Sequence, residues 1–148
     1  MRKAIVSGAN GFVGSAVVKE LISQGYEVYA LVRENHYDQV PINEMVRIVP
    51  FSLENIEALG EVIPINEYEA FYHFAWNGSA GVDRADTALQ LKNAQWTVEC
   101  LQMAKRLGCK RFVPAGSIME HETIAAVYTQ GNRPGAVSYT HLRAHETE

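Results

Sequence analysis

The sequence predicts an α/β fold: a doubly wound parallel sheet of about five strands in the order 3-2-1-4-5, incomplete at its C-terminal edge. Three observations predict it. Short apolar runs alternate with helical patterns, and the right-handed crossovers of such βαβ units favour this strand order. Three glycines follow the first apolar run and open the first helical pattern. After residue 116 no further complete strand-helix unit follows, although a six-stranded sheet of this kind needs one more strand.

Each element follows from a local pattern. Apolar runs of strand length predict strands at residues 4–6, 27–32, 46–51, 70–75 and 110–114. Apolar residues at helical spacing predict a helix after the first strand, ended by Gly25, and a short helix at 53–60. A longer helix is predicted at 84–107, with Asp83 as its N-cap and an inner face formed by Leu91, Ala94, Val98 and Leu101.

Composition and charge exclude several classes of protein. The 148 residues are 47% hydrophobic and 20% charged, which is ordinary for one globular domain with its own core. A net charge of −4 argues against nucleic acid as a partner. No apolar run reaches the length of a membrane span, and the N-terminus lacks the apolar core of a signal peptide. We therefore expect a cytoplasmic protein without a membrane partner, in which Cys100 and Cys109 are small buried side chains.

The first strand leads directly into a glycine turn with the spacing G-x-x-G-x-x-G, namely Gly8-Ala9-Asn10-Gly11-Phe12-Val13-Gly14. The first glycine allows a sharp turn, the second lets a diphosphate approach the backbone, and the third lets the helix pack closely on the sheet. The N–H groups of the first helical turn then face the anion. We predict that this turn holds the pyrophosphate of a nicotinamide dinucleotide. The alternative is a tight turn whose glycines only pack, and three glycines at this spacing would then be costly.

Three further segments follow in order: His73-Phe74-Ala75, Leu91-Lys92-Asn93-Ala94-Gln95-Trp96-Thr97, and Cys109-Lys110-Arg111-Phe112-Val113-Pro114-Ala115-Gly116-Ser117. With the glycine turn, they give a sequence that resembles the extended short-chain dehydrogenase/reductase family, the NAD(P)-dependent epimerases/dehydratases, over about residues 1–136. The resemblance implies a Rossmann-type, NAD(P)-binding domain. Any one of the four motifs would be weak evidence, but four in order at fitting spacings are specific.

The resemblance also implies roles for individual residues. The backbone of Phe12 and Val13 would contact the pyrophosphate, and Ala75 and Trp76 would lie along the ribose and nicotinamide side. Asn93 would help to hold the dinucleotide side of the cleft, with a polar residue on a solvated helix face as the alternative.

The catalytic residue that the resemblance implies is Ser117, which would hydrogen-bond the substrate oxygen during hydride transfer. The alternative is a loop serine at a strand end. We favour the catalytic role because Ser117 follows the fifth strand, at the edge where such sheets bind ligands. His73, inside an apolar strand, is expected to be a core histidine rather than an acid or base.

Two positions bear on the choice of cofactor. NAD-specific relatives often carry an acidic residue at the end of the second strand, where this chain has Val32 and then Arg33. An arginine there can pair with a 2′-phosphate, which modestly favours NADP, whereas Glu34 could still reach a ribose and keeps NAD open. Near the adenine the family tends to have Asp, where Ser52-Leu53 stand here.

The family's Tyr-x-x-x-Lys motif is missing from this sequence. Tyr139 is followed four residues later by Arg143, which does not replace lysine. Residues 137–148 resemble a translated adapter sequence, so we expect a truncated domain at 1–136 and a non-native, disordered tail at 137–148. No metal is assigned, even though the tail contains two histidines four residues apart.

The resemblance therefore implies the NAD(P)-binding part of an epimerase, dehydratase or reductase, with a nucleotide sugar as the expected substrate and with this chain itself inactive. It leaves a homodimeric parent enzyme open. Two alternatives remain: a non-catalytic dinucleotide-sensing module of the same fold, and an NADPH-dependent reductase of a non-sugar carbonyl, which Arg33 would suit.

Overall fold

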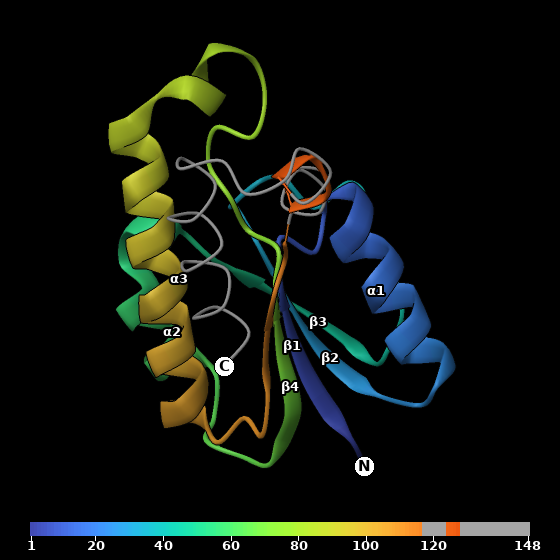
Figure 1. Ribbon diagram of the computed structural model, residues 1–148. Helices are drawn as coiled ribbons and strands as arrows, with labels where there is room; N and C mark the ends of the chain where they lie inside the picture. The colour runs from blue at the N-terminus through green and yellow to red at the C-terminus, as the bar shows by residue number, and fades with distance from the viewer. Residues whose placement is uncertain (117–123, 128–148) are drawn as a thin grey trace. The chain divides into compact units, whose positions relative to one another are not determined.

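The computed structural model describes residues 1–116 and 124–127, and within them a parallel five-stranded sheet lies between helices (Figure 1). The strand order is β3-β2-β1-β4-β5, which confirms the predicted fold class and order. The strands are β1 Lys3–Ser7, β2 Glu27–Val32, β3 Val46–Pro50, β4 Tyr68–His73 and β5 Phe112–Pro114. Among the described residues, β5 is an edge strand, since it pairs with β4 alone.

The register brings the carboxyl ends of the central strands together. Ser7, the last residue of β1, lies opposite Leu31 of β2 on one side and His73 of β4 on the other. The chain continues from β1 into α1 (Phe12–Ser23), on one face, while α2 (Leu59–Val62) and α3 (Thr87–Leu107) cover the other face (Figure 1). Because the connections on the two sides of β1 go to opposite faces, the point after Ser7 is the switch point where such sheets bind ligands.

Each face of the sheet has its own hydrophobic core. One core packs Val18 and Leu21 of α1 against alternate residues of β1 and β2. The other packs Met103 and Leu107 of α3 against β4 residues such as Phe71. Burying one such side chain stabilises the fold by about 1.5–3 kcal/mol, so both helices are fixed relative to the sheet edge. These residues belong to the compact unit Met1–Ala115; in the second unit, residues 124–127 are helical.

Several predicted boundaries shift in the structure. The fourth strand begins at Tyr68 and ends at His73, so Ala75 lies beyond it rather than inside it. The predicted helix at 53–60 is a 3-10 helix, Leu53–Ala58 (η1), followed by the short α2. Asn55 has non-helical backbone angles inside η1, which explains why a single regular helix does not form. The prediction that Gly25 follows the first helix is confirmed, because Gly25 has a φ of +82° just after the C-cap.

The predicted inner face of the long helix is wrong. Leu91, Val98 and Leu101 are 67%, 52% and 47% exposed, and Ala94 is also exposed. The buried residues are Asn93, Cys100, Met103, Ala104 and Leu107. The helix carries two stripes with helical spacing, and packing against η1 and β4 selects the one that includes a polar residue, Asn93.

The N-cap assigned to that helix is also wrong. Helix α3 begins at Thr87, and its N-cap is Asp86, whose carboxylate accepts a hydrogen bond from the Leu89 N–H. Asp83 belongs instead to a separate 3-10 turn, Gly81–Ala85 (η2). Both residues are acidic and stand before the helical pattern, so the capping hydrogen bond alone distinguishes them.

The two cysteines are protonated thiols rather than reactive groups. Cys100 is fully buried, as predicted, and burial raises the pKa of its thiol to about 12. Cys109 is only half-buried, which corrects the prediction for that residue, and partial burial raises its pKa to about 11.

Candidate dinucleotide site

A cleft of about 590 Å³ opens at the carboxyl ends of the strands, beside the switch point. Its volume falls in the range of ordinary ligand pockets, about 300–1,000 Å³. It brings together most of the predicted cofactor residues, namely Gly8, Asn10, Gly11, Arg33, Ser52, Leu53, Ala75 and Trp76. These residues come from the ends of β1, β2, β3 and β4, so four separate stretches of sequence converge on one cleft.

The three glycines of the turn meet different physical requirements. Gly8 has a φ of +65°, and a Cβ there would lie 2.8 Å from the Ala75 nitrogen. A Cβ on Gly14 would overlap the carbonyl oxygen of Gly8. Gly11 has an ordinary φ of −79°, and the nearest atom to its Cβ position would be the Gly8 oxygen at 3.3 Å. The fold itself therefore demands Gly8 and Gly14, whereas Gly11 is best explained by a ligand that approaches the backbone.

The first turn of α1 presents free donors beside Gly11. The Gly11 N–H donates a hydrogen bond to the Gly8 carbonyl oxygen, and the Ser15 N–H donates to the Gly11 carbonyl oxygen. Within residues 1–116 and 124–127, the N–H groups of Phe12, Val13 and Gly14 have no acceptor. The turn contains no acidic side chain that would repel an anion, and the Phe12 side chain is 92% exposed. A diphosphate fits this arrangement of donors and the helix dipole.

Ser7 and His73 join β1 to β4 directly beneath the cleft. The Ser7 hydroxyl accepts hydrogen bonds from the Phe74 and Ala75 N–H groups, at 3.1 and 3.2 Å. Its own proton is then left for the His73 Nδ1, 2.8 Å away, so the other imidazole proton lies on Nε2. Nε2 is buried and has no hydrogen-bond partner in the described part of the chain. The imidazole stacks on Phe112, which confirms that His73 is a core histidine.

Burial lowers the pKa of His73 from 6.5 to about 4, because the charged imidazolium would lose its hydration. Between these two values the unfolded chain binds a proton that the folded chain does not. We therefore expect the free energy of unfolding to fall by about 3 kcal/mol from His73 alone as the pH drops through this window. A His73→Asn variant should show a correspondingly shallower pH dependence in urea denaturation. The exposed His36→Asn variant should behave like the wild type, and identical slopes for all three proteins would contradict the assignment.

Asn93 reaches the cleft through the loop that forms its wall. It is 1% exposed, and its side-chain amide accepts from the Asn77 N–H at 3.0 Å and donates to the Asn77 carbonyl at 2.7 Å. Gln90 supports the same loop by donating to the Gly78 and Asp83 carbonyl oxygens and accepting from the Trp76 indole. Asn93 is thus neither solvated nor part of the cleft lining; it fixes the backbone after β4.

At the opposite wall, the Arg33 guanidinium donates to the Asn77 side-chain oxygen at 2.8 Å. His36 lines the cleft beside it and donates from Nδ1 to the Glu34 carbonyl, 3.0 Å away. Ser52 accepts from the Glu54 N–H as the N-cap of η1, and its hydroxyl proton remains available. Leu53 is buried behind it. The cleft therefore has a cationic, hydrogen-bonding wall at the ends of β2 and β3.

Some predicted residues lie elsewhere, and some lining residues were not predicted. Phe12 and Val13 do not line the cleft with their side chains, which is consistent with a role through the backbone. Ser117, Tyr139 and the predicted tail at 137–148 lie outside the described residues. Sequence reasoning missed lining residues that follow the strands, namely His36, Asn77 and Ser79 in loops and Glu54 in η1. Their position shortly after predicted strands could have identified them, because ligands bind at the carboxyl ends of such strands.

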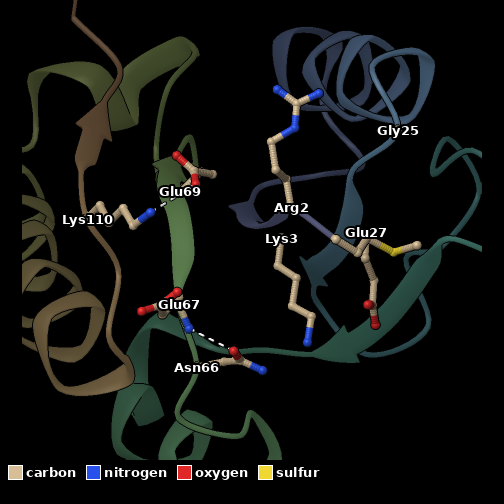
Figure 2. Close-up of a pocket in the computed structure, with 9 residues that line it drawn as sticks. Arg2, Lys3, Gly25, Glu27, Asn66, Glu67, Glu69 and Lys110 are labelled. Carbon is tan, nitrogen blue, oxygen red and sulfur yellow. Dashed lines mark hydrogen bonds and ion pairs between the residues drawn. The ribbon is translucent and has the colours of Figure 1, made fainter.

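A second hollow, of about 790 Å³, lies at the opposite end of the strands from the cleft (Figure 2). Lys3 and Glu27, the first residues of β1 and β2, line it, so it is at the amino ends of the strands. Lys110 and Glu69 form an ion pair there at 3.1 Å (Figure 2). Open α/β sheets bind ligands at their carboxyl ends, and this charged, wide opening therefore remains outside the candidate site.

Within the described residues, no helix is both long and apolar enough to cross a membrane. The same part of the chain contains no group of three or more His, Cys, Asp or Glu side chains arranged to hold a metal ion.

Solved structures resemble the fold of this chain, and curated proteins resemble its sequence. Among solved structures, a UDP-galactose 4-epimerase aligns with a TM-score of 0.63 and 22% identity, covering 78% of this chain and 38% of that one. An epimerase from Methanothermobacter thermautotrophicus aligns with a TM-score of 0.68 and 24% identity, covering 78% and 35%. The dTDP-6-deoxy-L-talose 4-dehydrogenase (NAD(+)) of Aggregatibacter actinomycetemcomitans is 29% identical over 119 residues, 78% of this chain and 42% of that protein.

A shorter match joins the chain to the decarboxylating sterol-4-alpha-carboxylate 3-dehydrogenase of Dictyostelium discoideum, 35% identical over 63 residues, 43% of this chain and 19% of that protein. The chain spans less than half the length of each of these relatives. The model of the NAD dependent epimerase/dehydratase family matches residues 4–142. Because that match covers nearly the whole sequence, the chain belongs to the NAD dependent epimerase/dehydratase family.

Proposed function

We propose that this chain is the dinucleotide-binding portion of an epimerase/dehydratase-type oxidoreductase that acts on a nucleotide sugar. The observation that carries the proposal is the pairing of Gly11, which has no Cβ beside the cleft, with three N–H groups at the start of α1 that have no acceptor among the described residues. A relative named as a dTDP-6-deoxy-L-talose 4-dehydrogenase supports the sugar substrate.

The chain's own residues divide the binding task. The N–H groups of Phe12 and Val13 would hold the pyrophosphate, with Asn10 at the same turn. Ser52 and Leu53 would border the adenine, and Ala75 and Trp76 would lie along the ribose and nicotinamide. When bound, the dinucleotide supplies a hydride acceptor. Ser117 would then align the substrate oxygen.

We infer that NADP is modestly favoured over NAD because Arg33 faces the cleft at the end of β2, where an acidic residue would take a ribose hydroxyl. The name of the talose dehydrogenase specifies NAD(+), so NAD remains the competing cofactor. A homodimeric parent enzyme belongs to the same proposal.

Arg33→Ala should weaken NADP binding by about 10- to 100-fold and leave NAD binding within about twofold, since a charged contact to phosphate is worth roughly 1.5–3 kcal/mol. Calorimetric titration of the 148-residue chain with each dinucleotide measures both affinities. Arg47→Ala is a matched control, because Arg47 pairs with Glu27 away from the cleft. An unchanged NADP/NAD ratio in Arg33→Ala would remove the 2′-phosphate role.

One observation favours a second candidate. The match to a sterol carboxylate dehydrogenase supports a non-sugar substrate, and a reductase of a non-sugar carbonyl would then use the same cleft. A non-catalytic dinucleotide sensor would need the glycine turn and the cleft but no catalytic residue. Binding of a nucleoside-diphosphate sugar to the parent enzyme would separate the first proposal from both.

A further inference from the structure

Arg33 and Asn77 meet across the mouth of the cleft. The Nη2 of Arg33, just after β2, donates to the Oδ1 of Asn77, after β4, at 2.8 Å. The two residues are 44 positions apart in sequence, and both line the cleft. The Arg33 side chain is exposed and makes no other hydrogen bond or ion pair in the described residues, so Asn77 is the contact that orients its guanidinium.

Asn77 is held in place independently of its side chain. Its backbone N–H and carbonyl are both bound by the amide of Asn93, a residue that is 1% exposed. Gln90 also bonds to Asn93, at 3.2 Å, and fixes the adjacent backbone at Gly78. A substitution of the Asn77 side chain therefore removes or changes the contact with Arg33 while leaving the bonds that hold the loop.

The chemistry of the Asn77 side chain matters for what Arg33 can bind. An amide oxygen takes one guanidinium N–H and adds no charge, so Arg33 keeps its positive charge and its other donors. A carboxylate in the same position would pair with the guanidinium and compete with any anionic ligand. The neutral acceptor thus orients the arginine without neutralising it.

We propose that Asn77 is a specificity-determining positioning residue, which holds Arg33 toward the cleft in a charged state that accepts the 2′-phosphate of NADP. This inference rests on the proposed role of Arg33 in cofactor choice. Under this inference, a residue that follows β4 contributes to the choice between NADP and NAD, together with Arg33 after β2.

The test is a set of calorimetric titrations with NADP and NAD on three variants of the 148-residue chain. Asn77→Asp keeps the size of the side chain and should weaken NADP binding by about tenfold, because its carboxylate pairs with Arg33 and repels the phosphate. Asn77→Ala should weaken NADP binding by about threefold, and NAD binding should stay within about twofold in both. Ser79→Asp is the matched control, since it places the same charge in the cleft lining without a contact to Arg33, and it should cost NADP less than Asn77→Asp does.

A double-mutant cycle distinguishes the role of Asn77 from the proposed role of Arg33 in cofactor choice. In an Arg33→Ala background, Asn77→Ala should have no further effect on the NADP/NAD ratio. If Arg33→Ala lowers the ratio but neither Asn77 variant does, the role of Asn77 is wrong and the role of Arg33 stands. If Ser79→Asp matches Asn77→Asp, general charge explains the effect and the inference fails. An unchanged ratio in Arg33→Ala removes the 2′-phosphate role of Arg33 and the inference with it, but leaves dinucleotide binding at the glycine turn standing. No dinucleotide binding at all overturns the proposed function together with the inference.

Discussion

Replacing Gly11 with valine is expected to weaken dinucleotide binding by at least about 100-fold while the chain remains folded. The backbone of Gly11 has a φ of −79°, which any residue can adopt. The nearest protein atom to a Cβ there is the Gly8 oxygen at 3.3 Å, a tight contact that a shift of a few tenths of an ångström relieves, and Gly11 borders the space of the cleft. That space is where a diphosphate must lie to reach the N–H groups of Phe12 and Val13. The measurement is calorimetric titration with NAD and NADP.

The matched variant is Gly14→Ala, which adds a smaller group to the same turn. We expect it to destabilise the fold, whereas Gly11→Val should weaken binding in a chain that remains folded. The Cβ of the Gly14→Ala variant would overlap the carbonyl oxygen of Gly8, so α1 could not keep its position on the sheet. We expect its melting temperature to fall by several degrees, whereas Gly11→Val should lose only about 1 kcal/mol as a poorer N-cap. Equal binding by the wild type and Gly11→Val would show that Gly11 does not contact a ligand.

The fold was largely predictable because its signals are local. A glycine after an apolar run, helical spacing and a glycine past a helix end each act within a few residues, and the strand order follows from the handedness of the crossovers. The C-terminal end of β4 was harder to predict from the sequence. Phe74 and Ala75 look like strand residues, but their N–H groups bond to the Ser7 hydroxyl, a contact made over more than sixty positions.

The buried face of α3 could not be deduced from periodicity alone. Leu91, Val98 and Leu101 form the more apolar stripe, yet they are exposed, while the stripe that contains Asn93 is buried. A buried asparagine is tolerable here because both ends of its amide are bonded to Asn77. The resemblance predicts a site role for Asn93, which stays a prediction, whereas its hydrogen bonds depend on a loop that only the tertiary structure positions.

The 148-residue chain is expected to bind dinucleotide but to show no hydride transfer with any nucleotide sugar or non-sugar alcohol. Hydride transfer from an alcohol needs a group that accepts the hydroxyl proton near neutral pH, and losing such a group costs about 10²–10⁴ in rate. Tyr-x-x-x-Lys occurs nowhere in the sequence. Among the described residues that line the cleft, the titratable side chains are Arg33, His36 and Glu54.

None of these three groups is suited to replace the missing base. The guanidinium of Arg33 carries donors and no acceptor nitrogen, whereas Glu54 follows β3 and His36 follows β2. The resemblance implies that the nicotinamide lies beside Ala75 and Trp76, which follow β4. A base must lie near the nicotinamide, because the alcohol loses its proton and its hydride from neighbouring atoms, whereas Glu54 and His36 follow other strands. His73 is nearer that side, but its Nδ1 is occupied by Ser7, and its lowered pKa makes it a weak base.

The assay is the change in nicotinamide absorbance on adding substrate to chain and oxidised dinucleotide, with Gly11→Val as the background control. Equal, near-zero rates in the two proteins are the expected result, together with binding in the wild type alone. Turnover by the wild type that Gly11→Val abolishes would mean that a residue outside the described part of the chain, or one of His36 and Glu54, accepts the proton. His36→Asn and Glu54→Gln would then tell these sources apart, because a rate that survives both substitutions must come from residues beyond the described cleft.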